Sequence, residues 1–116
     1  MPHTQSTPRI WFETHGDAGT PVLMLMGFGM VGSVWMPQVE AIREHHRVTF
    51  LDNRGVGQSD PVRGLMKMKD LAADALRVAD ELGWERFHLV GVSMGGMVAQ
   101  EFTLQYPDRV RSLSLI

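Results

Sequence analysis

The pentapeptide Gly91-Val92-Ser93-Met94-Gly95 constrains the fold of this chain more than any other stretch. It follows residues 87–90, an apolar run typical of a buried strand, and it precedes residues 96–106, whose pattern predicts a helix. A turn from a strand into a helix within so few residues strains the backbone of the serine, and it leaves room only for glycine where the neighbouring backbones approach. We therefore expect Ser93 to project from the end of a strand, with the amino end of a helix behind it.

Strand and helix patterns alternate along the rest of the chain. The expected strands cover residues 9–15, 22–26, 47–51, 87–90 and 109–116, and the expected helices cover residues 35–45, 68–82 and 96–106. This alternation predicts an α/β fold, in which a mostly parallel sheet carries helices on both faces. We expect a flexible tail over residues 1–8 and a single domain over residues 9–116.

Composition excludes several classes of protein. The 116 residues carry a formal net charge of −2 and no cluster of lysine or arginine, so we expect no nucleic-acid partner. The chain has no cysteine, and no spacing of its histidines and acids suits a metal, so we expect no disulfide and no metal site. The polar amino terminus lacks the apolar core of a signal peptide, and residues 22–26 are too few to span a bilayer. We therefore expect a cytoplasmic protein with no membrane partner.

Three motifs stand in a fixed order along the chain. An apolar strand runs into Met26-Gly27-Phe28-Gly29, with Trp35 downstream; residues 52–60 read Asp-Asn-Arg-Gly-Val-Gly-Gln-Ser-Asp; and residues 91–96 are followed by Tyr106-Pro107-Asp108-Arg109-Val110. Together they resemble the amino-terminal half of α/β-hydrolase-fold proteins of the esterase, lipase and haloperoxidase-like kind. The resemblance covers residues 9–116.

The resemblance implies a site and a reaction. Ser93 would be the nucleophile, and the backbone amides of Phe28 and Met94 would form the oxyanion hole. The expected substrates are carboxylic esters or related small acyl compounds, and no cofactor is implied. We expect Arg54 to brace its loop, Asp52 to stabilise a turn and Trp35 to anchor the core.

The sequence departs from the family pattern in two places. Met26 stands where many members have a histidine that supports the loop. The acid and the histidine of the family's triad follow the serine along the chain, on later strands, and the sequence ends at Ile116. We therefore expect an α/β-hydrolase core without its last strands and cap, and only weak hydrolysis.

The five histidines of the chain offer no obvious general base. His88 precedes Ser93 by five residues along a strand, which is about 16 Å at ~3.3 Å per residue. Strand direction places His15, His45 and His46 at the opposite end of the sheet. Only His3 is expected on the serine's side, within the predicted tail.

Two alternatives remain open at this point. The chain could be a non-catalytic half-domain or fragment that associates with itself, forming a homo-oligomer through the exposed edge of residues 111–116. It could instead bind a dinucleotide, because Gly27-Phe28-Gly29-Met30-Val31-Gly32 follows a strand and Asp52 ends the next one. Pro37 argues against the second alternative, since it places the start of the helix beyond the last glycine.

Overall fold

Five strands form one sheet in the order β1-β3-β2-β4-β5 in the computed structural model, which describes residues 3–116. The strands are β1 (Phe12–His15), β2 (Thr20–Leu25), β3 (His46–Leu51), β4 (Phe87–Gly91) and β5 (Val110–Leu115). Only β1 runs antiparallel to its neighbour, β3, and the other three pairings are parallel. The prediction of a mostly parallel α/β sheet is confirmed.

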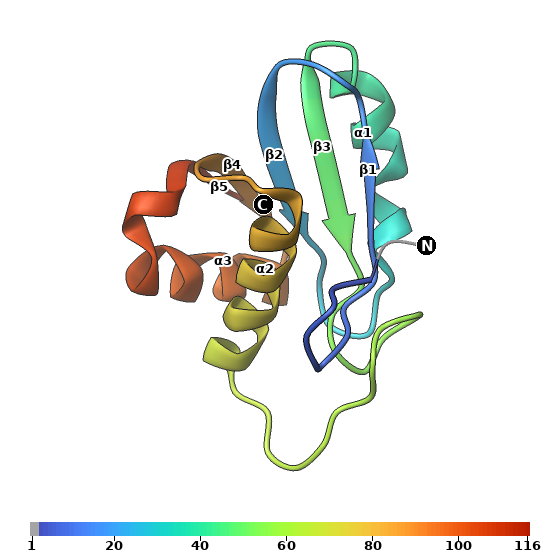
Figure 1. The fold of residues 1–116 in the computed structure, drawn as a ribbon, viewed down its shortest axis with the longest axis vertical. Helices are drawn as coiled ribbons and strands as arrows, with labels where there is room; N and C mark the ends of the chain where they lie inside the picture. Colours follow the sequence, from blue (N-terminus) through green and yellow to red (C-terminus); the bar gives the residue numbers. More distant parts are fainter. Residues whose placement is uncertain (1–2) are drawn as a thin grey trace.

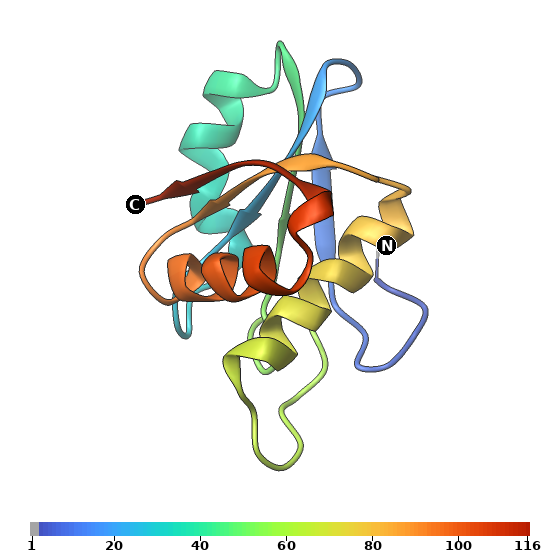
Figure 2. The same ribbon diagram turned by 90° about the vertical axis from the view of Figure 1, so that its left-hand side faces the viewer.

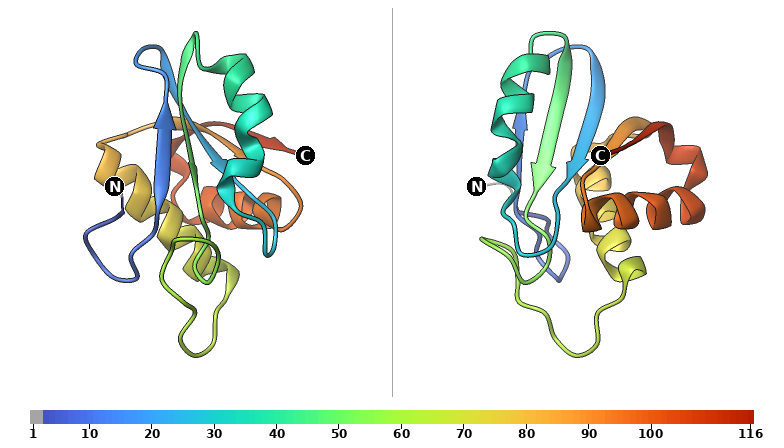
Figure 3. Two further views of the ribbon diagram at one scale, coloured as in Figure 1. Left: turned by 90° about the vertical axis from the view of Figure 1, so that its right-hand side faces the viewer. Right: turned by 180° about the vertical axis from the view of Figure 1, so that it is seen from behind.

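Helices cover both faces of this sheet, as predicted. Helix α1 (Met36–Ile42) lies on one face, and helices α2 (Met68–Leu82) and α3 (Met94–Gln105) lie on the other (Figures 1 and 3). Alternate residues of β2 follow the two faces: Leu23 and Leu25 join the core under α2 and α3, while Val22 and Met24 join the core under α1. Trp35 is 3% exposed in the second core, so it is the anchor that the sequence predicts.

Helix α2 has the bounds that the sequence predicts. Its apolar residues Leu71, Ala75 and Val78 are buried on one side. The Asp70 carboxylate accepts a hydrogen bond from the Lys67 backbone amide at 2.8 Å, which satisfies a donor at the first turn. Gly83 ends the helix in the left-handed conformation, with φ 72°.

Other elements differ from their predicted bounds. The expected helix 35–45 is shorter, because a 3-10 turn, η1 (Gly32–Trp35), precedes α1, which ends at Ile42. Helix α3 begins at Met94 rather than at residue 96, because the turn at Ser93 leads directly into it. The last strand begins after a second 3-10 turn, η2 (Pro107–Arg109). No helix within residues 3–116 is long and apolar enough to cross a membrane.

The expected tail over residues 1–8 packs on the fold over the part that the structure describes. Thr4 is fully buried: its amide donates to Ile10 O, and its hydroxyl accepts from the Ile10 amide, both at 2.9 Å. The Gln5 amide donates to Glu81 Oε1 of α2 at 3.1 Å. These hydrogen bonds join Thr4 and Gln5 to the rest of the fold. Met1 and Pro2 lie outside the described residues.

Candidate active site

Ser93 lies in the turn between β4 and α3. Its backbone has φ 55° and ψ −123°, and no other non-glycine residue in the described chain has a positive φ. Such a conformation costs of order 1–3 kcal/mol, so the surrounding structure must hold it in place. Its side chain is exposed and makes no hydrogen bond to the first turn of α3. The serine therefore stands free at the end of the sheet, as the pentapeptide predicts.

The two outer glycines of the pentapeptide are required by close packing. A Cβ atom added to Gly91 would lie 2.3 Å from the carbonyl oxygen of Gly95. A Cβ atom added to Gly95 would lie 2.3 Å from the carbonyl oxygen of Leu25, at the end of β2. Because both obstacles are backbone atoms, neither position accepts a larger residue without a shift of the chain.

The loop after β2 rests against Ser93. Leu25 and Gly91 are paired at the ends of β2 and β4, and the Val92 amide donates to Leu25 O at 3.2 Å. A Cβ atom added to Gly27 would lie 3.4 Å from Ser93 Cβ and 3.9 Å from Ser93 Oγ. Phe28, the next residue, therefore follows directly from the backbone that contacts the serine.

The backbone amides of Phe28 and Met94 have no backbone acceptor within residues 3–116. The amides of Gly95 and Gly96 bond back to the carbonyls of Val92 and Ser93, at 2.8 and 2.9 Å. The amide of Met94 at the start of α3 makes no such bond, and neither does the amide of Phe28. The structure thus places Ser93, Phe28 and Met94 after the adjoining ends of β2 and β4.

The described histidines lie away from Ser93. His46 Nδ1 bonds to Thr20 Oγ1 at 3.0 Å, and His88 Nδ1 bonds to Ser112 Oγ at 2.7 Å. The rings of His46 and His88 are 6.3 Å apart at the amino ends of the parallel strands. Burial, followed by the charges of Arg111 and His46, lowers the pKa of His88 below its ordinary value of 6.5.

His3 lies at the same end of the sheet as Ser93 but beside the far strand. Its bridge partner is Trp11, next to β1, and its Nε2 bonds to Gln58 O at 3.0 Å. Three strand spacings separate β1 from β4, which is roughly 14 Å at ~4.8 Å each. His3 therefore does not lie beside Ser93.

The loop after β3 is braced by its polar side chains. Asp52 stabilises the turn as predicted: its carboxylate accepts from the amides of Gly32 and Gln58, at 2.8 and 3.0 Å. Asn53, which sequence reasoning missed, donates from Nδ2 to Met26 O at 3.1 Å. The only sequence signal for Asn53 is its place directly after a buried strand.

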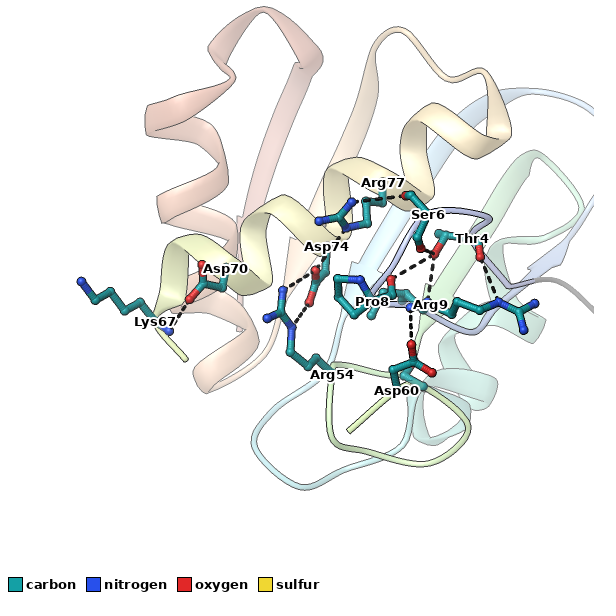
Figure 4. A network of polar contacts seen from close by, with 12 residues as sticks. Thr4, Ser6, Pro8, Arg9, Arg54, Asp60, Lys67, Asp70, Asp74 and Arg77 are labelled. Atoms are coloured by element: carbon teal, nitrogen blue, oxygen red, sulfur yellow. Dashed lines mark hydrogen bonds and ion pairs between the residues drawn. The ribbon is translucent and has the colours of Figure 1, made fainter. Parts of the chain in front are cut away.

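Arg54 also braces this loop, through a partner that the sequence did not reveal. It forms two hydrogen bonds to the carboxylate of Asp74 in α2, at 2.8 and 2.7 Å (Figure 4). These hydrogen bonds and the charge of Asp74 raise the pKa of Arg54, against the opposing effect of burial. Asp74 is fully buried and follows Leu71 by three residues in α2. The sequence signal for this ion pair is therefore a charged residue on the apolar face of a helix.

The geometry does not suit a dinucleotide site. Helix α1 begins at Met36, beyond Gly32, so no helix starts within the glycine run. Both carboxylate oxygens of Asp52 already accept hydrogen bonds from the protein. Within residues 3–116, no three His, Cys, Asp or Glu side chains are grouped as metal ligands.

Comparison with known proteins gives consistent matches. The family model described as alpha/beta hydrolase fold matches residues 20–116. The "Putative carbamate hydrolase RutD" of Azorhizobium caulinodans is 38% identical over 107 residues, which are 92% of this chain and 40% of that protein. The chain therefore spans less than half of this relative.

Solved structures match over nearly the whole chain. One is described as "Est816 as an N-Acyl homoserine lactone degrading enzyme", with TM-score 0.93, 30% identity, and coverage of 99% of this chain and 44% of that one. Another is a thermophilic esterase from Thermogutta terrifontis, with TM-score 0.89, 36% identity, and coverage of 97% and 42%.

Proposed function

The chain belongs to the α/β-hydrolase fold family, and on that premise we propose that it carries the nucleophile and the oxyanion hole of a serine hydrolase. Ser93 is the proposed nucleophile, and the amides of Phe28 and Met94 are the proposed oxyanion donors. The proposed substrates are carboxylic esters and related small acyl compounds. The names of the relatives mention an esterase, a lactone and a carbamate, and esters, lactones and carbamates all have an electrophilic carbonyl carbon bonded to oxygen.

The reaction would proceed in two steps through an acyl-enzyme. Ser93 Oγ attacks the acyl carbon, its proton passes to a general base, and the amides of Phe28 and Met94 donate to the negative oxygen that forms. The bond to the leaving group breaks, and the leaving oxygen takes the proton from the base. Water, deprotonated by the same base, then attacks the acyl carbon, so that the carboxylic acid leaves and Ser93 is restored.

The observation that carries this proposal is the backbone of Ser93. A positive φ on a serine, held between two glycines that cannot be enlarged, is a costly arrangement with no evident role in packing. The side chain of Ser93 is exposed, and the backbone of Gly27 lies close to it. These features support a site for acyl transfer better than a simple turn.

The general base is the part of the mechanism that the described residues do not supply. All five histidines lie in residues 3–116, and none bonds to Ser93. We therefore expect this chain by itself to react only with activated substrates. In serine hydrolases without a complete triad, the oxyanion hole and binding leave about 10³–10⁴-fold of acceleration over water.

A fluorophosphonate probe, followed by intact-mass measurement, tests the nucleophile. We expect one slow adduct on the folded chain, because the free amides stabilise the negative oxygen of the phosphorus centre. The adduct should be absent from Ser93→Ala. It should persist in Ser33→Ala, which removes another exposed serine as a matched control.

Two results would contradict the proposed nucleophile. One is the absence of any adduct on a chain shown by circular dichroism to be folded. The other is an adduct of equal yield on Ser93→Ala, which would place the reactive group elsewhere.

The free edge of β5 supports a second proposal, that this chain associates with itself. β5 ends the sheet, and Leu115 and Ile116 beside it are 50% and 73% exposed. An exposed apolar edge strand is a template for pairing with another chain. Light scattering at tens of micromolar should show a dimer or larger species, and Leu115→Lys should shift it toward monomer. A clean wild-type monomer would contradict the proposal.

A further inference from the structure

Two buried polar residues, Asp52 and Asn53, follow β3 directly. These two residues are only 2% and 3% exposed. Burying a carboxylate or an amide costs free energy unless the group is hydrogen-bonded. The hydrogen bonds of these two side chains therefore indicate which segment they hold in place. What they hold is the loop that carries Phe28.

Asp52 and Asn53 bind the two ends of the segment from Met26 to Gly32. Asn53 Nδ2 donates to Met26 O at 3.1 Å, at the start of the segment. Asp52 Oδ1 accepts from the Gly32 amide at 2.8 Å, at its end. Between these two points the segment makes one internal turn, in which the Met30 amide donates to Gly27 O at 3.3 Å.

The chemistry of each contact fixes which residue can make it. A carbonyl oxygen accepts only, so the group facing Met26 O must be a donor, which asparagine supplies and aspartate does not. A backbone amide donates only, so the group facing Gly32 must be an acceptor, and an ionised carboxylate is the stronger one. The order aspartate then asparagine therefore matches the two ends of the segment.

Asp52 is itself held firmly. Its second carboxylate oxygen accepts from the Gln58 amide at 3.0 Å, and its amide donates to Trp11 O at 3.0 Å. Gly32 packs closely on the same strand end, since a Cβ atom there would lie 2.5 Å from Leu51 O. The segment is thus fixed to a strand end that has little freedom to move.

We infer that Asp52 and Asn53 are positioning residues for the oxyanion hole: by fixing both ends of the Met26-to-Gly32 segment, they hold the Phe28 amide beside Ser93. The inference rests on the proposed function, because it concerns one of the two proposed oxyanion donors. Neither side chain touches Ser93, so both act through the backbone of the segment. An oxyanion donor must be held in place before the reaction, since its contribution comes from pre-organisation.

Backbone order of the Phe28 amide, measured by ¹⁵N relaxation, tests the inference on the folded chain. In the wild type we expect an order parameter near that of rigid backbone, about 0.85. In Asn53→Asp and in Asp52→Ala we expect it to fall below about 0.6, the range of flexible loops, with the strands unchanged. The Gly32 amide should also exchange with solvent about tenfold faster in Asp52→Ala, because it loses a charged acceptor.

Ser59→Ala is the matched control. The Ser59 hydroxyl bonds to Asp52 O at 2.5 Å and accepts from the Trp11 amide at 2.9 Å, so this variant loses two bonds in the same loop. It loses none to the Met26-to-Gly32 segment, so Phe28 should keep its order. If Asp52→Ala does not fold, Asp52→Asn, which retains one acceptor oxygen, should give an intermediate order parameter. An unchanged order parameter of the Phe28 amide in folded Asn53→Asp and Asp52→Ala would overturn the inference.

Labelling of Ser93 separates this inference from the proposed function. If the wild type reacts with the fluorophosphonate, Asn53→Asp and Asp52→Ala should react at least tenfold more slowly, and Asp52→Asn should recover part of the rate. Equal rates would refute the positioning role and leave the nucleophile standing. A wild type that takes no adduct would refute the proposed function, while the order of Phe28 would still decide whether the segment is held.

Discussion

The ion pair between Arg54 and Asp74 is the strongest candidate for a single contact that stabilises the loop after β3. The carboxylate of Asp74 is fully buried, and the side chain of Arg54 is 16% exposed. Arg77 approaches the same carboxylate, with Nε 3.5 Å from Oδ1, and donates to Ser6 Oγ at 3.2 Å (Figure 4). One carboxylate therefore joins the loop, helix α2 and the amino-terminal segment.

Arg54→Ala should be strongly destabilising. Removing one partner of a buried ion pair costs about 3–5 kcal/mol, because the remaining charge stays buried without compensation. Arg77 retains part of the compensation at its longer distance, so we expect the lower end, about 3 kcal/mol. Such a loss is a large fraction of the 5–15 kcal/mol that is typical of a folded domain.

Urea denaturation measures this loss directly. With a slope of about 1.5 kcal/mol per molar urea, a loss of about 3 kcal/mol would lower the unfolding midpoint by about 2 M. The double variant Arg54→Met with Asp74→Leu should be more stable than Arg54→Ala, because well-packed apolar residues replace both charges. This comparison separates the cost of an unpaired carboxylate from the loss of packing.

A surface pair provides the control. Glu40 lies in α1 and Arg43 follows the end of that helix; Arg43 Nη1 is 3.1 Å from Glu40 Oε1 and both side chains are exposed. Arg43→Ala should therefore change stability by less than about 1 kcal/mol. If Arg54→Ala cost no more than Arg43→Ala, the account of Asp74 as a buried charge that needs Arg54 would be refuted.

Two further predictions concern the turn between β4 and α3 and the opposite end of the sheet. Gly95→Ala should destabilise the chain by about 1–3 kcal/mol, because the new Cβ atom would meet Leu25 O. Gly96→Ala should be neutral or stabilising, because the nearest atom to its new Cβ is 3.4 Å away. Equal thermal midpoints of the two variants would contradict this prediction. The pKa of His88 should lie below 6.5 in an NMR titration. The His88 imidazole then binds a proton more readily in the unfolded chain than in the folded chain. His88 should therefore lower the free energy of unfolding as the pH falls below 6.5, and His88→Gln should lack this contribution.

The sequence predicted those elements whose ends have a local chemical signal. Helix α2 has its observed bounds because Asp70 caps its first turn and Gly83 ends it. Strand β4 is recognisable because Gly91 ends an apolar run. The start of α3 was placed too late, since two glycines at a helix start resemble a loop. Of these two, Gly95 is required by backbone packing, because a Cβ atom there would lie 2.3 Å from Leu25 O.

The motif residues of the candidate site could be predicted from the sequence. The hydrogen bonds that join the candidate site to segments distant in the sequence could not. Ser93, Phe28 and Met94 follow from the motifs and meet at adjoining strand ends. The contact of Asn53 with Met26 O and that of Arg54 with Asp74 each join segments twenty or more residues apart. No local pattern specifies such pairs, because they depend on which strand lies beside which in the sheet.

The order of strands in the sheet has a consequence for how the chain folds (Figure 2). The close packing of Gly95 on Leu25 needs β2 and β4 side by side, and in sequence these strands are separated by α1, β3 and α2. Contacts between distant segments form slowly, because closing a long loop costs entropy before the contact repays it. The Ser93 amide, moreover, bonds to the carbonyl of Ile116, which follows β5. We therefore expect the positive φ of Ser93 to be among the last features of the fold to form.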